Sequence, residues 1–191
     1  MSEIMLPLHG IDGTKLGSEL SMAELVKPLI GRPYLYGADP TWLSNRLNTI
    51  GVAAETTDAP SNCQALGHML LYRATGVELP LHVLSMEMAV SPNVDGPLVE
   101  VDVTPTQAVG GELAIADVAL LKRASSELMG HRRRLTDAHV APVVGNDESG
   151  KTLVLHADYR GVSSVRTLES LVELPQYSGI LGVRRLREQS V

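Results

Sequence analysis

The chain has 191 residues, 16 basic against 22 acidic side chains for a net charge of −6, and only 3% aromatic residues. This length suits one domain with a sizeable core, and the acidic balance with few aromatic rings argues against a general nucleic-acid binder. The single cysteine excludes an intrachain disulfide framework and a multi-cysteine zinc site.

The first fifteen residues, MSEIMLPLHGIDGTK, lack the basic segment and continuous apolar segment of a secretion signal. No uninterrupted apolar stretch approaches the roughly 18 residues that a membrane helix needs. We therefore expect no membrane span and a cytoplasmic location by default. A phage-encoded protein or a delivered effector would have the same features.

The beginning of the chain predicts a loose arm over residues 1–20, punctuated by glycines. A short helix should follow, because Ser21 and Glu24 form a capping-box pattern, and it should close around Gly31. Pro33 then predicts an extended segment that leads into a turn.

The next elements are a short helix predicted at Trp42–Ile50, a polar loop, and a longer helix in SNCQALGHMLLYRATG. Ser61 and Gln64 form a second capping-box pattern, and the apolar run ends at Gly76. This places Cys63 in the first helical turn, where unpaired N–H groups and the helix dipole favour a thiolate. The alternative interpretation of Cys63 is a small buried hydrophobic residue.

The second half of the chain changes to strand-like segments separated by Gly, Asn and Asp turns. The strand candidates are LHVLSMEMAV, PLVEVDVTP, DVALLKR, AHVAPVVG, KTLVLHAD, GVSSVRTL and GILGVRRLRE. NDESGK is a plausible hairpin connection between two of them. Helices first and strands later predict an α+β fold with a mostly antiparallel sheet.

Two histidines in these strands give Cys63 a chemical context. A cysteine hydrolase needs a thiolate, an imidazole that relays its proton, and a polar group that orients the imidazole. If NDESGK joins neighbouring strands, His139 and His156 can lie side by side on one face of the sheet. The alternative for each is a hydrogen-bonded, half-buried strand residue.

Three blocks of the sequence resemble the NlpC/p-sixty family of papain-like cysteine peptidases, which cleave amide bonds in bacterial cell-wall peptides. LIGRPYLYGAD resembles the family's helix end followed by Pro-Tyr-x-Tyr/Trp-Gly-Gly, and SNCQALGHMLLY resembles its Asp-Cys-Ser-Gly-aliphatic helix start. The segment from HVAPVVG through LVLHAD to ILGVRRL resembles the family's two histidine strands and its terminal Arg-Arg strand. ADVALL corresponds to its Gly-Asp-Leu strand.

The resemblance implies a papain-like fold in which N-terminal helices carry the nucleophile and pack on the sheet. It implies Cys63 as nucleophile, His139 as general base and His156 as the orienting third member. Tyr34 matches a tyrosine near the family's active site, where its hydroxyl helps to position the substrate or the oxyanion.

The chain also departs from the family pattern beside the nucleophile. Asn62 stands where the family has Asp, and Gln64 stands where it has Ser. We predict that these two residues and Tyr34 contact the substrate, with a specificity altered by the lost carboxylate. Residues 40–60 and 80–116 read as insertions in a single catalytic domain that spans 21–191.

The expected function is a thiol hydrolase that cleaves an amide bond in a peptidoglycan-type or related peptide. The alternatives are an acyltransferase or amidase of the same fold, and a catalytically silent binding module of a phage tail or secretion apparatus. The chain has no P-loop, serine-esterase or zincin motif, and we expect no metal and no cofactor. The oligomeric state is left open.

Overall fold

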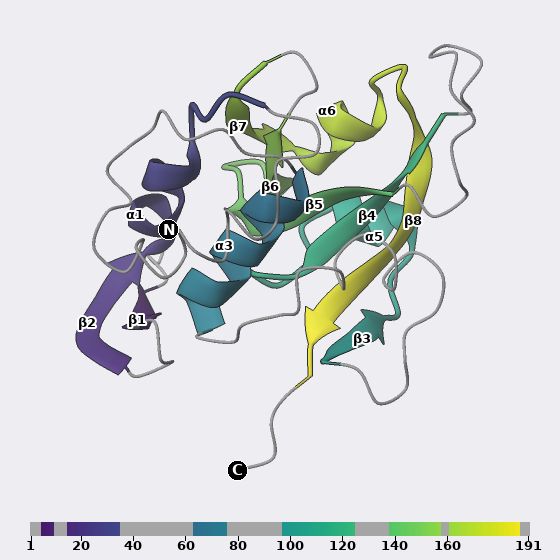
Figure 1. Cartoon of the computed structure of the whole chain (residues 1–191). Coiled ribbons are helices and arrows are strands. Elements are labelled where there is room, and N and C mark those ends of the chain that lie inside the picture. Colours follow the sequence, from purple (N-terminus) through teal and green to yellow (C-terminus); the bar gives the residue numbers. More distant parts are fainter. Residues whose placement is uncertain are drawn as a thin grey trace. The chain divides into compact units, whose positions relative to one another are not determined.

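The computed structural model of the chain describes residues 5–9, 15–34, 63–75, 97–124, 138–157 and 161–187 (Figure 1). It is an α+β protein with a mostly antiparallel sheet, as the sequence predicts. The chain divides into two compact units, where the sequence suggests a single domain after an N-terminal arm. The first unit comprises Met1–Leu81 and Leu155–Val165, and the second comprises His82–Val154 and Arg166–Val191.

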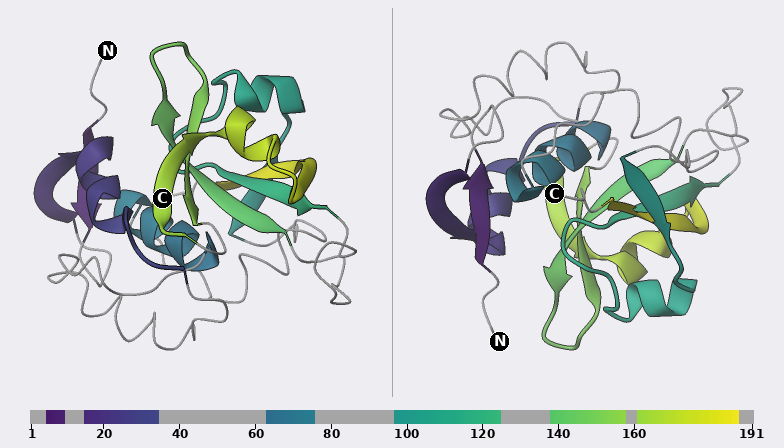
Figure 2. Two further views of the ribbon diagram at one scale, coloured as in Figure 1. Left: turned by 90° about the horizontal axis from the view of Figure 1, so that it is seen from above. Right: turned by 90° about the horizontal axis from the view of Figure 1, so that it is seen from below.

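The first unit begins with a two-stranded antiparallel sheet (Figure 2). Strand β1, Met5–His9, pairs with β2, Lys15–Ser21, from Met5 opposite Ser21 to His9 opposite Lys15. The prediction of a loose arm over residues 1–20 is therefore wrong for both segments. The glycine turn signals do not mark this sheet as predicted, because Gly17 lies within β2, and Gly10 and Gly13 lie outside the described residues.

The predicted capping box at Ser21 is confirmed. Helix α1, Met22–Val26, is followed by the 3-10 helix η1, Lys27–Leu29. The Ser21 amide donates to Glu24 Oε2 at 2.9 Å, and the Glu24 amide donates back to Ser21 Oγ at 3.3 Å. The hydrogen bond from the Ser21 amide is the main cause that holds the pKa of Glu24 below its ordinary value.

Helix α3, Cys63–Thr75, confirms the predicted helix around the lone cysteine. Its apolar residues Leu66, Leu70 and Leu71 are fully buried. Near its end, the Thr75 hydroxyl donates to the Leu71 carbonyl at 2.6 Å. Ser61, half of the predicted capping box, lies outside the described residues, as does the helix predicted at 42–50.

A six-stranded sheet has the order β3-β8-β4-β5-β6-β7. Six of the seven strand candidates form these strands, and LHVLSMEMAV lies outside the described residues. Four neighbouring pairs are antiparallel: β3 with β8, β8 with β4, β4 with β5, and β5 with β6. The bounds are Leu98–Val101 for β3, Val118–Arg123 for β4, His139–Asn146 for β5, Thr152–Ala157 for β6, Ser163–Thr167 for β7 and Tyr177–Leu186 for β8.

The predicted hairpin at NDESGK is confirmed between β5 and β6. The Asp147 carboxylate accepts hydrogen bonds from the Ser149 hydroxyl, the Ser149 amide and the Lys151 amide. The bond from the Ser149 hydroxyl is the main cause that lowers the pKa of Asp147. Gly150 adopts φ +83°, the left-handed conformation that glycine accepts without steric cost.

Two short helices of the second unit, α5 and α6, were not predicted from the sequence. Helix α5, Pro105–Val109, opens with a complete capping box between Thr104 and Gln107 and has proline in its first turn. Helix α6, Leu168–Val172, is capped by the Thr167 hydroxyl. The Thr-Pro-x-Gln pattern is a start signal that strand alternation in the preceding residues obscured.

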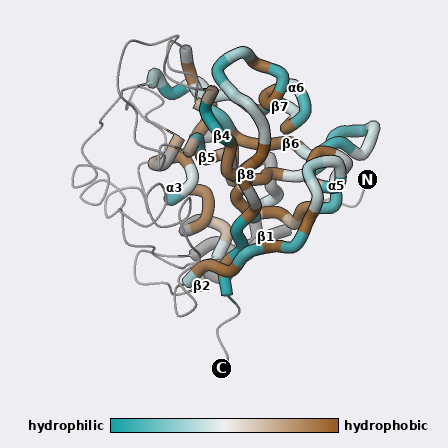
Figure 3. The backbone as a smooth tube through the Cα atoms, turned by 90° about the vertical axis from the view of Figure 1, so that its right-hand side faces the viewer, coloured by the Kyte–Doolittle hydropathy of each residue, from teal (hydrophilic) through white to brown (hydrophobic). Residues whose placement is uncertain are grey.

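The core of the second unit lies between these helices and the strands. Its buried members are Ala108, Leu113, Ala119, Leu121, Ala141, Val143, Val154, Leu168, Leu171 and Val183. Figure 3 shows how hydrophobic positions follow the strands of the sheet. Alternate residues of β5 reach this core, which is the pattern expected for a pleated strand with one face packed against helices.

A buried carboxylate stabilises the start of β4. Asp117 is 1% exposed and receives two hydrogen bonds of 2.6 Å from the Arg185 guanidinium on β8. It also accepts from the Ala114 amide at 2.9 Å. The preceding residue, Ala116, has φ +69°, a conformation that non-glycine residues rarely adopt. Bidentate pairing of this kind both satisfies the carboxylate and fixes the turn.

Candidate functional site

The predicted nucleophile Cys63 is the first residue of α3 and is 9% exposed. A helix start carries N–H groups without intrahelical partners, and these favour a thiolate and can donate to an oxyanion. The structure thus confirms the predicted position of Cys63 in the first turn of a helix. Of its two predicted neighbours, Gln64 follows in the first helical turn, and Asn62 lies outside the described residues.

The predicted general base His139 is the first residue of β5 and is 1% exposed. Its backbone pairs with Leu121 of β4, and its ring centroid lies 5.0 Å from that of Tyr177 with the planes tilted by 38°. Strand alternation puts His139 on the same face of β5 as Ala141 and Val143. This face contributes to the core of the second unit.

The predicted third member, His156, lies in β6 and is fully buried. Strand β6 is continuous across the boundary between the units, which falls between Val154 and Leu155. His156 lies on the same face of this strand as Val154, because one residue separates the two positions. Val154 in turn pairs with Val143 of β5.

The three predicted catalytic residues are divided between the two units. Cys63 and His156 belong to the first unit, and His139 belongs to the second. Each occupies the kind of element that the sequence predicts, a helix start or a strand of an antiparallel sheet. The convergence of the three side chains stays a prediction.

Tyr34, the predicted substrate contact, is half-buried and lies in an extended segment after η1. Its amide donates to the Gly161 carbonyl at 3.1 Å, and Pro33 forms an antiparallel bridge with Val162. The segment is thus attached, within the first unit, to the residues that lead into β7. The prediction of an extended stretch after Gly31 is confirmed up to this residue.

A residue that the sequence did not single out, Ser163, holds this segment in place. Its buried hydroxyl donates to the Leu29 carbonyl at 2.5 Å and accepts from the Arg32 amide at 2.8 Å. Its backbone exchanges two further hydrogen bonds with Gly31 and Arg32, each of 2.8 Å. No sequence pattern distinguishes Ser163 from its neighbour Ser164, since the contact depends on a partner 131 positions away.

Replacing Ser163 with alanine should lower the free energy of unfolding by about 2 kcal/mol, because buried donor and acceptor groups lose their partner. Ser164→Ala is the matched control, since Ser164 is only half-buried, and a change within about 0.5 kcal/mol is expected. Urea unfolding followed by circular dichroism measures both. Equal midpoints for the two variants would contradict this role of the hydroxyl.

Among the described residues, no three His, Cys, Asp or Glu side chains gather in a way that could hold a metal ion. In the same part of the chain, no helix is both long and apolar enough to cross a membrane.

Comparison with known proteins adds no family to these observations. No protein-family model matches the chain, and no curated protein matches it either.

Proposed function

We propose that the protein is a thiol hydrolase of the papain-like NlpC/p-sixty type that cleaves an amide bond in a cell-wall-type or related peptide. The observation that carries this proposal is the ordered set of Cys63, His139 and His156. The cysteine opens a helix, and the two histidines follow in strands of one antiparallel sheet.

Two features of the second unit support the alignment with that family. The Gly-Asp-Leu strand of the family corresponds to Ala116, Asp117 and the start of β4. Ala116 adopts the positive φ that glycine accepts most readily. Asp117 is joined to Arg185, in the segment that resembles the family's terminal Arg-Arg strand, by a bidentate ion pair.

In the proposed reaction, the Cys63 thiol transfers its proton to His139, and the thiolate attacks the amide carbonyl. The backbone N–H of Cys63 stabilises the oxyanion of the tetrahedral intermediate. His139 then protonates the leaving amine, which leaves a thioester on Cys63. A water molecule, deprotonated by His139, hydrolyses the thioester, while His156 orients the imidazole. This series of reaction steps requires the Cys63 Sγ atom to lie within about 4 Å of a His139 ring nitrogen.

The burial of all three residues makes the competing interpretation concrete. With exposed fractions of 9%, 1% and 0%, Cys63, His139 and His156 can also serve as packing residues of a silent binding module. The two interpretations differ in the protonation of the thiol. A thiol paired with imidazole reacts as thiolate near neutral pH, whereas an isolated buried thiol does not.

Alkylation of Cys63 by iodoacetamide across pH 4 to 10 tests the proposal. The rate should reach its plateau below pH 7, and His139→Ala should move the midpoint up toward roughly 8.5, the value of a free cysteine. His68→Gln is the matched control, because His68 is a buried histidine of the same helix as Cys63. A wild-type profile no faster than a model thiol near neutral pH would favour the silent module.

A further inference from the structure

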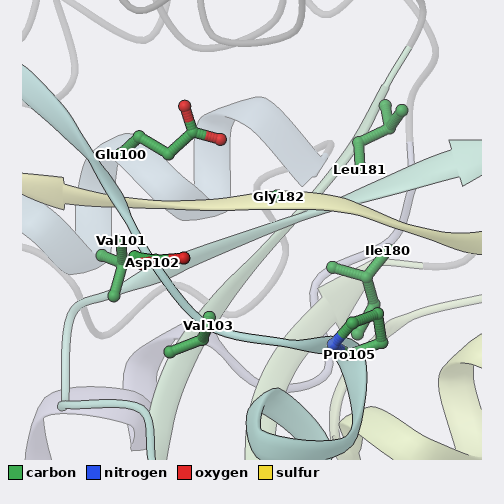
Figure 4. Close-up of a pocket in the computed structure, with 8 residues that line it drawn as sticks. All are labelled: Glu100, Val101, Asp102, Val103, Pro105, Ile180, Leu181 and Gly182. Carbon is green, nitrogen blue, oxygen red and sulfur yellow. The ribbon is translucent and has the colours of Figure 1, made fainter.

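The second unit contains a cavity of about 400 Å³, and none of the three predicted catalytic residues lines it. It lies between residues 100–105, which run from β3 to α5, and residues 180–182 of β8 (Figure 4). The sequence did not indicate it, because its walls come from segments about 80 positions apart.

The cavity forms where two paired strands separate. Strand β3 pairs with β8 as far as Val101 opposite Val183. A hydrogen bond of 3.0 Å from the Val103 amide to the Val101 carbonyl then bends the chain toward α5. Strand β8 continues past this point beside β4, so its other edge faces the cavity over residues 180–182.

One wall of the cavity is apolar. Leu120 pairs with Gly182 and Leu121 pairs with Ile180, so Leu181 is the extra residue of a β-bulge. The bulge turns Leu181 out of the sheet and leaves it 42% exposed. Figure 4 shows Leu181 and Glu100 on the same side of β8, with the side-chain-free Gly182 between them.

The other wall is acidic. Glu100 and Asp102 line the cavity and both are exposed, and none of the described residues that line it is basic. Glu100 is paired loosely with Arg184, at 3.3 Å. Asp102 forms no ion pair with any residue in the described part of the chain. The cavity therefore offers more negative than positive charge beside an exposed leucine.

We propose that this cavity binds a primary ammonium group carried on an aliphatic chain. The ammonium group lies against Asp102 and the outer side of the Glu100 carboxylate, and the aliphatic chain covers Leu181. An ammonium is a compact cation with three donors and suits two separate carboxylates, whereas a guanidinium prefers one carboxylate in a planar, bidentate arrangement. The same charges repel anions, and the leucine disfavours small inorganic cations.

Titration of the full chain with n-hexylammonium, followed by ¹H–¹⁵N spectra at fixed ionic strength, tests this proposal. We expect saturable shifts centred on residues 100–105 and 180–182. The neutral analogue 1-hexanol and the anion hexanoate should bind about threefold to fivefold more weakly, since a solvent-exposed ion pair contributes up to about fivefold.

Asp102→Asn should weaken hexylammonium binding by about threefold to fivefold, and Leu181→Ser should also weaken it. Glu148→Gln removes the same charge in the exposed β5–β6 turn and should leave the affinity unchanged. Cys63→Ala should also leave it unchanged, which separates this cavity from the proposed reaction. Equal binding of 1-hexanol, an unaltered Asp102→Asn affinity, or shifts centred elsewhere would each overturn the proposal.

Two further ligands identify the source of the ammonium group. The peptide acetyl-Ala-Lys-Ala-amide is compared with its norleucine counterpart, which lacks only the ammonium. Tighter binding of the lysine peptide than of hexylammonium assigns the cavity to a lysine side chain of a peptide. Binding of hexylammonium but not of the lysine peptide assigns it to a small free amine.

Discussion

Cys63→Ala should lower the rate of amide hydrolysis by about 10⁴-fold or more on muropeptide and stem-peptide substrates. The thiolate forms the covalent intermediate in the proposed reaction, and catalysis that remains after such a loss comes from binding and oxyanion stabilisation alone. The measurement is product formation by liquid chromatography with mass detection, over hours for the variant and minutes for the wild type. A variant as active as the wild type would end the proposal.

The double variant distinguishes a catalytic set from independent structural effects. His139→Ala alone should cost a similar factor, and Cys63→Ala with His139→Ala should be no slower than either single variant. Residues that act as one unit are strongly non-additive, because the first loss already removes the shared step. Multiplying losses would instead show that His139 acts through stability, which thermal unfolding of each variant would report.

Added amines address the alternative of acyl transfer. A hydrolase gives free acid from the thioester, and an acyltransferase gives a new amide when an amine acceptor is present. Mass analysis of products with and without the acceptor separates the two reactions. Both outcomes keep Cys63 as nucleophile, so this measurement refines the proposal without replacing the test by Cys63→Ala.

Gly111→Ala should have the largest effect on stability, about 3 kcal/mol or more. Gly111 has φ +87°, and a β-carbon there would lie 2.0 Å from the Gly150 carbonyl oxygen. The left-handed conformation costs a non-glycine residue about 1–2 kcal/mol, and forced overpacking typically adds about 1–3 kcal/mol. The substitution also strains the hydrogen bond of 3.1 Å from the Gly111 amide to Thr152 Oγ1.

Gly150→Ala is the matched control for this prediction. Gly150 has nearly the same φ, +83°, but its added β-carbon meets no atom within 4 Å. It should therefore show only the conformational cost, and the difference between the variants isolates the backbone clash. Urea unfolding followed by circular dichroism measures both, and a Gly111→Ala midpoint no lower than that of Gly150→Ala would contradict the argument.

The sequence predicted those features that depend on neighbouring residues. The Ser21–Glu24 capping box, the Cys63 helix and the NDESGK hairpin all involve groups within a few positions, and all are present. It failed for the pairing of β1 with β2, because Gly17, which indicated a turn in the sequence, lies within β2. It also missed α5 and α6, whose caps follow directly after strand-like alternation.

Features that depend on distant partners were beyond the sequence. Ser163 binds a segment 131 positions earlier, and the cavity at Leu181 depends on a β-bulge that only the register of β4 and β8 reveals. For the candidate site, the sequence predicted the helix start at Cys63 and the two strands that carry the histidines. The contact between Cys63 and His139 stays a prediction, which the kinetic measurements on the variants test.

The interleaving of the two units has a consequence for how the chain is synthesised. The first unit needs residues 155–165, which leave the ribosome only after most of the second unit has been made. Until then, Leu29 and Arg32 lack the Ser163 hydroxyl that holds them. Domains of consecutive sequence usually fold from the N-terminus as they emerge. Here Leu29 and Arg32 gain these hydrogen bonds only after residues 155–165 have emerged, late in translation.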